Sequence, residues 1–323
     1  MEVTKESCGK KTLLAVRTMA TTSMPVHKIF IIIVTYNGEK HVDSFASGFS
    51  ELPAGWRVVI VDNASQDGTV SKLRAEYSHF TVVEQRENIG FGRANNIGLR
   101  MALAEEADFI LLLNQDAKIS VESIQFLAEV HERHPECLIV SPIHLNITGD
   151  DLDEPFLHYC MPRVCPGLVA DVFTARAKEL YYSQLGNAAI WLLSRNCLEI
   201  IGGFNPLFHM YGEDDEYRDR VFYHGYMLGI IPSIFAFHTR ENRTSDKYKY
   251  YFSGALYELL KPHQKLNYKY VGGMLLKGML KEVIKCNIRR AASCIFFFIS
   301  LLKMKKNIVA AKEQTKRKGA TFL

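Results

Sequence analysis

Short apolar segments that alternate with helical segments most strongly constrain the fold of this chain. Four of them, rich in valine, isoleucine and leucine, span residues 29–35, 58–61, 81–84 and 109–113. Helical patterns separate or follow them, at residues 38–49, 69–77, 92–106 and 121–133. Strands that form continuous apolar runs are buried on both faces, and the helices between them allow parallel pairing. The pattern therefore predicts an α/β, Rossmann-like fold with a mostly parallel central sheet and helices on both faces.

The second half of the chain keeps this alternation less strictly. A weaker strand is expected at 138–140, and residues 144–185 then contain three prolines and few periodic runs. We interpret residues 144–185 as an insertion that covers the substrate, rather than as a linker. Strand patterns return at 188–193 and 230–237, and helical patterns at 194–200 and 213–223.

Polar residues follow each of the first four strands, where a parallel sheet of this kind binds its ligands. In chain order they are Thr35-Tyr36-Asn37, Asp62-Asn63, Asn88 to Arg93, and Asn114-Gln115-Asp116. Taken singly, each is also explained by turn or helix-cap chemistry. A carboxylate such as Asp62 could instead accept hydrogen bonds from a nucleobase or ribose. Gly90 and Gly92 would let the backbone approach a phosphate, although the third glycine of a dinucleotide fingerprint is missing.

The triplet Asn114-Gln115-Asp116 has a single carboxylate. Magnesium and manganese take oxygen ligands, often one or two carboxylates with the remainder from phosphates and water. Asp116 could therefore suffice for a metal site if a nucleoside diphosphate supplies other ligands. The alternative is an Asx-type cap for the helix that begins near Ser120.

A run of four acids from Glu213 to Glu216 is the next candidate, and His238 ends the last strand. Such a run usually marks a solvated helix start, and a lone histidine is more often a packing residue. The run follows an apolar, aromatic segment, however, which suggests partial burial. Burial would raise the pKa of a carboxyl group there and suit it to general-base catalysis.

Cysteine and charge patterns bear on the cellular setting. The seven cysteines are scattered and form no C-x-x-C pair, which favours a reducing compartment over a disulfide framework or zinc site. The net charge of +4 divides into about −9 for residues 1–260 and about +13 for residues 261–323. Such a basic C-terminal region suggests contact with an anionic surface.

The C-terminal region shows an amphipathic pattern. Lys277, Lys281, Lys285 and Arg289 recur every four residues and are expected on one helix face, and the apolar run 294–302 is flanked by further basic residues. We favour helices that lie in a membrane interface beside anionic lipids. The alternative is a helical cap on the catalytic domain. No apolar run reaches the roughly 18 residues needed to span a bilayer.

Taken together, these elements resemble glycosyltransferase family 2, in its rhamnosyltransferase-like branch, over residues 28–242. The elements that carry the resemblance are Val34-Thr35-Tyr36-Asn37, Val61-Asp62-Asn63-Ala64-Ser65, Asn88-Ile89-Gly90-Phe91-Gly92, Asn114-Gln115-Asp116, Gly202-Gly203-Phe204, Glu213-Asp214 and His238. None is decisive alone, but their order and spacing are specific. The resemblance implies a GT-A fold and an inverting enzyme that uses a nucleotide-sugar donor.

The resemblance also implies roles for individual residues. Asp214 would be the catalytic base, with Glu213 beside it. Asp116 and His238 would bind Mg²⁺ or Mn²⁺, although asparagine replaces the first acid of the family's Asp-x-Asp motif and puts strict metal dependence in doubt. The nucleotide-sugar would contact Thr35, Tyr36, Asn37, Asp62, Asn63, Asn88, Gly90, Phe91, Arg93, Asn114 and Gln115.

The expected function is transfer of rhamnose or another hexose to a glycan acceptor, lipid-linked, in surface polysaccharide or O-antigen synthesis. The enzyme would be cytoplasmic, peripheral on the inner face of the cell membrane, and would not bind nucleic acid. Three regions are expected: a disordered N-terminus (1–26), a GT-A domain (27–245) and a basic amphipathic helical region (246–323). The rival interpretations are a nucleotidyltransferase, an NAD-type oxidoreductase, or a non-enzymatic module whose basic tail binds membrane or nucleic acid.

Overall fold

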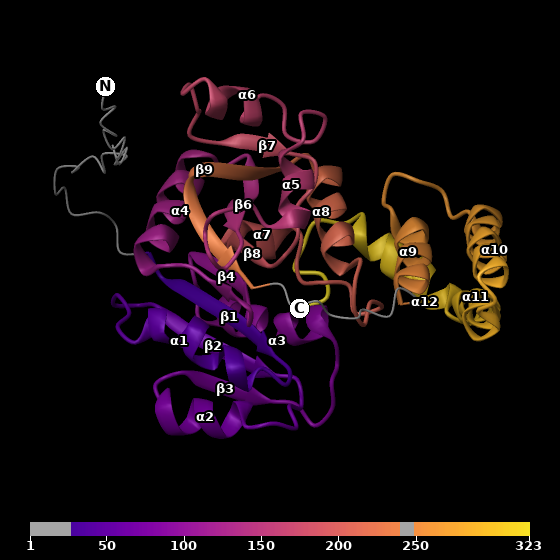
Figure 1. The fold of residues 1–323 in the computed structure, drawn as a ribbon, viewed down its shortest axis with the longest axis horizontal. Helices are drawn as coiled ribbons and strands as arrows, with labels where there is room; N and C mark the ends of the chain where they lie inside the picture. The colour runs from indigo at the N-terminus through magenta and orange to yellow at the C-terminus, as the bar shows by residue number, and fades with distance from the viewer. Residues whose placement is uncertain (1–26, 240–248) are drawn as a thin grey trace, which may run out of the picture.

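The structure is a computed structural model that describes residues 27–239 and 249–323. In these ranges nine strands form one sheet, in the order β3-β2-β1-β4-β8-β6-β9-β5, with β7 paired to β9 (Figure 1). The strands are β1 (Ile29–Thr35), β2 (Arg57–Asp62), β3 (Thr81–Glu84), β4 (Phe109–Asn114), β5 (Ala117–Lys118), β6 (Cys137–Leu145), β7 (Tyr181–Ser183), β8 (Ile190–Ser194) and β9 (Met227–His238). The expected disorder of residues 1–26 concerns a segment outside the described residues.

Helices cover both faces of this sheet. They are α1 (Val42–Ala46), α2 (Thr69–Glu76), α3 (Phe91–Ala104), α4 (Val121–Arg133), α5 (Glu154–Cys160), α6 (Leu168–Phe173), α7 (Arg195–Ile200) and α8 (Glu213–Tyr223), with 3₁₀ turns η1 (Glu39–His41) and η2 (Ser47–Phe49) beside α1. The side chains of strand β1 show why the sheet needs a layer of helices on each face. Ile29, Ile31 and Ile33 pack in a core with α1, α2 and α4, whereas Phe30 and Ile32 pack in a second core with α3, α7 and α8. Alternate side chains of one buried strand thus face opposite layers.

The parallel part of the sheet aligns the polar strand ends. β1 pairs in parallel with β2 and β4, and β2 with β3. The register places Thr35 opposite Asp62, Asp62 opposite Glu84, and Val34 opposite Asn114. The α/β fold with helices on both faces is confirmed. Antiparallel strands enter the sheet at β8, β5 and β7.

Two regions contain elements that were not predicted from the sequence. The short strand β5 pairs with the end of β9, so that Ala117 lies opposite His238. Residues 144–185, which show few periodic runs, contain α5, α6 and β7. Both depend on long-range pairing or packing, which a local sequence pattern does not report.

Four helices follow the sheet: α9 (Lys249–Leu260), α10 (Tyr268–Ile284), α11 (Ile288–Lys303) and α12 (Lys305–Thr315). They share a third apolar cluster, into which Phe208 inserts. Among the helices of the described ranges, none is long and apolar enough to cross a membrane. The division of the chain at residue 245 stays a prediction.

The expected single basic face in this region is wrong. α10 ends at Ile284, Cys286 has a positive φ of 57°, and the side chain of Asn287 caps α11. Arg289 therefore lies on a different helix from Lys277 and Lys281. Lys285 is the C-cap of α10. A four-residue spacing places residues on one face only while the helix continues.

Candidate active site

Asp62 lies at the centre of a hydrogen-bonded cluster at the ends of β1 and β2. It is 1% exposed. Its carboxylate accepts hydrogen bonds from the Thr35 hydroxyl (2.8 Å), the Ser65 backbone N–H (2.9 Å) and the Ser65 hydroxyl (2.6 Å). Ser65 Oγ in turn accepts from the backbone N–H of Asn37, which has a left-handed φ of 48°. Asp62 is thus held rigidly at the sheet edge, as a recognition group requires.

Two residues that were predicted to contact the nucleotide-sugar, Gln115 and Asn63, also hold loops in place. Gln115 Oε1 accepts from the backbone N–H of Tyr36 (2.8 Å), and its amide nitrogen donates back to the Tyr36 carbonyl. Asn63 Oδ1 accepts from the backbone N–H of Ile89, which anchors the loop after β3. The aromatic side chain of Tyr36 remains 44% exposed. Asn114 is the last residue of β4, and its side chain is half-buried.

The loop from Asn88 to Arg93 contacts the segment that precedes α8. His209 Nε2 lies 3.1 Å from the carbonyl of Asn88, and Arg93 Nε donates to the carbonyl of Pro206 (2.8 Å). Gly90 has φ of 89° and lies so close to the His209 carbonyl that a Cβ atom would clash with it. Phe91, at the first position of α3, packs edge-on against Phe204. The loop and the approach to α8 therefore form one surface.

Asp116 and His238 lie side by side. Nε2 of His238 is 3.2 Å from Oδ1 of Asp116, and both side chains are buried. The pairing of β5 with β9 and a 2.7 Å bond from the Thr239 N–H to the Asp116 carbonyl fix this approach. The alternative role of Asp116 as a cap is wrong, because Ser120 caps α4 through its own hydroxyl. A carboxylate and an imidazole at this distance fit a divalent cation.

The acidic run occupies the first turn of α8, and two of its four members are neutralised. Asp215 pairs with Arg218 (2.7 Å), and the fully buried Glu216 pairs with Arg220 (3.1 Å). Arg220 also donates to the carbonyls of Ile201 and Gly203. The two remaining acids, Glu213 and Asp214, are the ones that the sequence pointed to as catalytic.

Glu213 and Asp214 are electrostatically strained. Burial, followed by the charge of Asp214, raises the pKa of Glu213 well above its usual value. Burial, followed by the charge of Asp215, raises the pKa of Asp214. Glu213 is 5% exposed, and within the described residues its Oε2 makes no hydrogen bond. The chain enters this turn through two left-handed residues, Tyr211 (φ 69°) and Gly212 (φ 86°), and such conformations are frequent at functional sites.

The sequence analysis did not identify three residues of this region that contribute to the site. Ser65 donates two hydrogen bonds to the carboxylate of Asp62. The only sequence feature that pointed to it was its position in the strand-end motif. His144 and Asp153 adjoin His238, and their candidate ligand atoms lie within 4.8 Å of its own. Asp153 precedes Glu154-Pro155, so the local sequence marks it as an ordinary helix cap.

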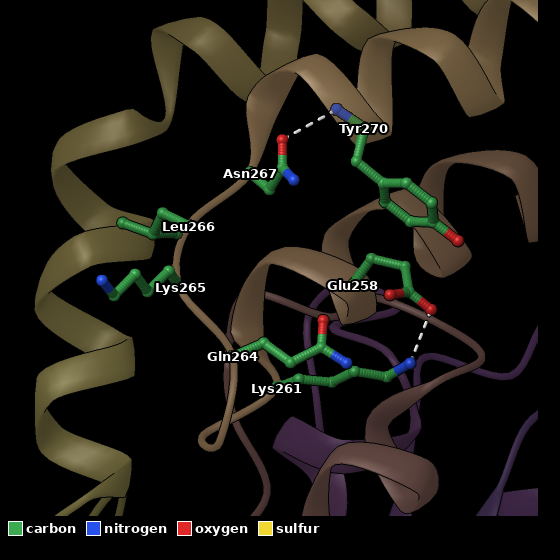
Figure 2. A pocket seen from close by; sticks show the side chains of 7 residues that line it. All are labelled: Glu258, Lys261, Gln264, Lys265, Leu266, Asn267 and Tyr270. Carbon is green, nitrogen blue, oxygen red and sulfur yellow. Dashed lines mark hydrogen bonds and ion pairs between the residues drawn. The ribbon is translucent and has the colours of Figure 1, made fainter.

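The described surface also has a hollow in the helical region. It has a volume of about 590 Å³ and lies between the end of α9 and the start of α10 (Figure 2). Its lining residues are Glu258, Lys261, Gln264, Lys265, Leu266, Asn267 and Tyr270. None of the candidate site residues lines this hollow, which belongs to the helical region rather than to the strand ends.

Comparison with solved structures identifies the fold. The mannosyltransferase PcManGT from Pyrobaculum calidifontis, solved with GDP-Man and Mn²⁺, superimposes with a TM-score of 0.51 at 17% identity, over 90% of this chain and 87% of that chain. The shared fold is GT-A, and the strand-end site described above lies in it. The chain has the GT-A fold.

Sequence comparison then shows which family the chain resembles. The model of "Glycosyl transferase family 2" matches residues 30–185. The dTDP-rhamnosyl transferase RfbF of Shigella flexneri is 25% identical over 207 residues, which cover 64% of this chain and 67% of that protein. The N-acetylglucosaminyl-diphospho-decaprenol L-rhamnosyltransferase of Mycobacterium tuberculosis is 24% identical over 245 residues, covering 66% and 76%. Over these ranges the chain is similar to glycosyltransferase family 2 and to these two rhamnosyltransferases.

Proposed function

We propose that this enzyme transfers rhamnose or another hexose from a nucleoside-diphosphate sugar to a hydroxyl of a lipid-linked glycan, in surface polysaccharide or O-antigen synthesis. The two relatives support the sugar, since both are named for rhamnosyl transfer. The mycobacterial relative supports the acceptor, since its name specifies a diphospho-decaprenol carrier. The observation that carries the proposal is a rigid strand-end cluster together with a strained acidic pair on α8.

The donor nucleotide would bind at the strand ends. Asp62 would accept hydrogen bonds from the base, while Thr35 and Asn37 line the same pocket. The exposed ring of Tyr36 offers a face for stacking. The surface from Asn88 to Arg93 would lie beside the sugar diphosphate, where glycine and the start of α3 favour an anion.

Asp116 and His238 would hold Mg²⁺ or Mn²⁺ at the donor's diphosphate. Such an ion supplies positive charge that stabilises the departing nucleoside diphosphate. Mn²⁺ in the PcManGT structure supports a divalent metal. Asn114 adds an amide at the same strand end.

Asp214 would act as the general base of an inverting displacement. It would take the proton of the acceptor hydroxyl while that oxygen attacks the anomeric carbon from the face opposite the leaving group. The new bond to the acceptor oxygen forms opposite the bond to the diphosphate oxygen that breaks, so the anomeric configuration inverts and no covalent enzyme intermediate is needed. A carboxylate with a raised pKa is a stronger base than an ordinary aspartate. The negative charge of Asp215 contributes to this raised pKa, and Glu213 would lie beside the base in the same helical turn.

A donor screen tests the proposal. Wild-type protein is mixed with UDP-, dTDP- and GDP-sugars, with and without Mn²⁺, and its melting temperature is measured. We expect one donor class to stabilise the protein, more strongly with Mn²⁺, because ligands that bind only the folded state raise its stability. The Asp62→Ala variant is the control and should lose this stabilisation. Stabilisation by NAD in place of every sugar nucleotide would contradict the proposal and favour the oxidoreductase alternative.

We also propose that α10 and α11 bind an anionic membrane surface. They lie on the side of α9 away from the sheet (Figure 1). Ile284 and Ile288 are 83% and 77% exposed at the turn between the two helices, close to the exposed Lys281 and Lys285. Large exposed apolar side chains beside basic ones are typical of segments that bind the lipid interface. This placement would keep the enzyme at the inner face of the cell membrane, next to a lipid-linked acceptor.

Sedimentation with lipid vesicles tests this surface. We expect binding to vesicles that contain phosphatidylglycerol, and weaker binding as salt increases. Replacing Ile284 and Ile288 by serine should reduce binding several-fold. The matched control exchanges two exposed basic residues of the other half of the chain, Arg86 and Arg163, for glutamate and should leave binding unchanged. Equal binding to neutral vesicles, or preference for single-stranded nucleic acid, would contradict the proposal.

A further inference from the structure

Asp153 lies behind His238, on the side of the imidazole ring that faces away from Asp116. Nε2 of His238 is 3.2 Å from Oδ1 of Asp116, whereas Nδ1 is 3.7 Å from Oδ2 of Asp153. The two ring nitrogens therefore face two different carboxylates. All three side chains are buried, Asp153 at 4% exposure.

A closed turn of the chain places Asp153 in this position. The turn after β6 is closed by a bond from the Asn146 N–H to the Asp151 carbonyl (2.9 Å) and by a bridge between Leu145 and Leu152. The Asp153 N–H then donates to the His144 carbonyl (2.9 Å). Because β6 runs beside β9, this turn places Asp153 next to His238.

The local sequence assigns Asp153 a different role, which the structure does not bear out. Asp153 is the N-cap residue of α5, a position where aspartate normally accepts a bond from the first helical turn. Its side chain makes no such bond. The cap residues of α4 and α7, Ser120 and Ser194, do make theirs. The carboxylate of Asp153 is directed to His238 instead of to its own helix.

We propose that Asp153 is a positioning residue that orients His238 for metal binding. When Nε2 of a neutral imidazole binds a metal ion, its proton must be on Nδ1, and Nδ1–H then needs an acceptor. Asp153 is placed to accept this hydrogen bond, which fixes the tautomer and the ring plane. Carboxylates behind metal-binding histidines commonly have this role. The inference rests on the proposed function, since it concerns the ion that Asp116 and His238 would hold.

The observed distance is consistent with a contact that tightens on binding. At 3.7 Å the Nδ1–Oδ2 pair is longer than a formed hydrogen bond. A movement of roughly 0.8 Å would bring it to the usual 2.9 Å. Hydrogen bonds at catalytic sites are often long before ligands bind and shorten afterwards.

Direct measurement of Mn²⁺ binding tests the proposal. The full chain is titrated with Mn²⁺ in the presence of dTDP, and free Mn²⁺ is followed by electron paramagnetic resonance. Asp153→Ala should weaken Mn²⁺ binding about 10- to 100-fold, the usual effect of losing such a partner. Asp153→Asn keeps an acceptor oxygen and should weaken it much less. Affinity for dTDP alone should be the same in all variants.

Two controls make the outcome specific. Ser120→Ala removes a real helix cap near Asp116 and should lower the melting temperature without changing the Mn²⁺ dissociation constant. His144→Gln separates the proposal from direct binding of the ion by His144, Asp153 and His238 together. Under the proposal it has little effect on Mn²⁺ affinity.

Three results would count against the inference. Unchanged Mn²⁺ affinity in Asp153→Ala would overturn it. An equal loss in His144→Gln or in Ser120→Ala would overturn it too, in favour of direct ligation or of general destabilisation. A wild-type protein that binds dTDP but no Mn²⁺ would overturn the metal site of the proposed function itself, and the inference with it.

Discussion

Two buried carboxyl clusters of this molecule differ sharply in how well their charges are compensated. Asp62 accepts three hydrogen bonds from Thr35 and Ser65 at the ends of parallel strands. Glu213 and Asp214 lie in the first turn of α8, where burial and neighbouring negative charge raise the pKa of both. Asp215 and Glu216, the adjacent members of the same run, have arginine partners.

This difference in charge compensation suits the two carboxyl clusters to two different functions, ligand recognition and general-base catalysis. A fully bonded carboxylate is rigid and suits recognition, because its geometry is fixed before a ligand arrives. A poorly compensated carboxylate costs stability, but it binds a proton more readily and suits general-base catalysis. The arginine pairs on α8 show that the fold could have neutralised Glu213 and Asp214 by the same means.

The largest expected effect follows from removing the proposed base. Asp214→Asn should lower kcat by about 10²- to 10⁴-fold, the range for loss of a general acid or base. Affinity for the donor nucleotide should remain within about twofold, as measured by calorimetry. Asp215→Asn is the matched control, because the carboxylate it removes already pairs with Arg218. Full transfer activity in Asp214→Asn would refute the assignment of the base.

Removing Asp62, the proposed recognition carboxylate, should mainly lower donor affinity and stability rather than kcat. Asp62→Ala leaves the Thr35 hydroxyl and both Ser65 donors without their acceptor, so unfolding in urea should show a loss of roughly 2–4 kcal/mol. Donor affinity should fall more than tenfold. Asp67→Ala serves as control, since that carboxylate also accepts bonds near the strand ends but is exposed. Wild-type donor affinity in Asp62→Ala would remove Asp62 from the binding site.

The pH dependence of activity should reflect the raised pKa of Asp214. Transfer requires its ionised form, so kcat/KM should fall as pH decreases through the folded-state pKa. Because that pKa is raised, the fall should begin at a higher pH than for an ordinary aspartate, whose pKa is about 4. Asp215→Asn removes the negative neighbour that raises this pKa and should shift the acidic limb to lower pH. A profile that stays flat down to about pH 4.5 would contradict the assignment.

The smallest expected effect is on stability. Glu213 has a higher pKa in the folded than in the unfolded chain, so the folded protein loses stability as pH rises from the unfolded value of about 4 toward the folded one. Glu213→Gln does not ionise and should escape this loss. It should therefore be more stable than wild type by about 1 kcal/mol at pH 8, with a smaller difference at pH 5, in urea unfolding. Equal stability of the two proteins at both pH values would show that Glu213 is adequately compensated.

Much of the fold and several site residues could be predicted from local sequence. The predicted strands at 29–35 and 81–84 and the helices at 121–133 and 213–223 match β1, β3, α4 and α8. These segments are short and strongly patterned, and their ends carry turn or cap residues. The helix of the C-terminal region was predicted too long, because the break at Cys286 and Asn287 has no glycine or proline to announce it.

The sequence by itself determined the α/β alternation, the polar residues at the strand ends and the acidic run in the first turn of α8, because these depend on residues close together in the chain. The tertiary structure decided which acids are neutralised, since Arg218 and Arg220 could have been solvated. It also decided that Asp116 faces His238 and that His238 faces Asp153. These contacts join residues far apart in the chain, through the β5–β9 and β6–β9 pairings. Such pairings depend on the whole sheet, and no local pattern encodes them.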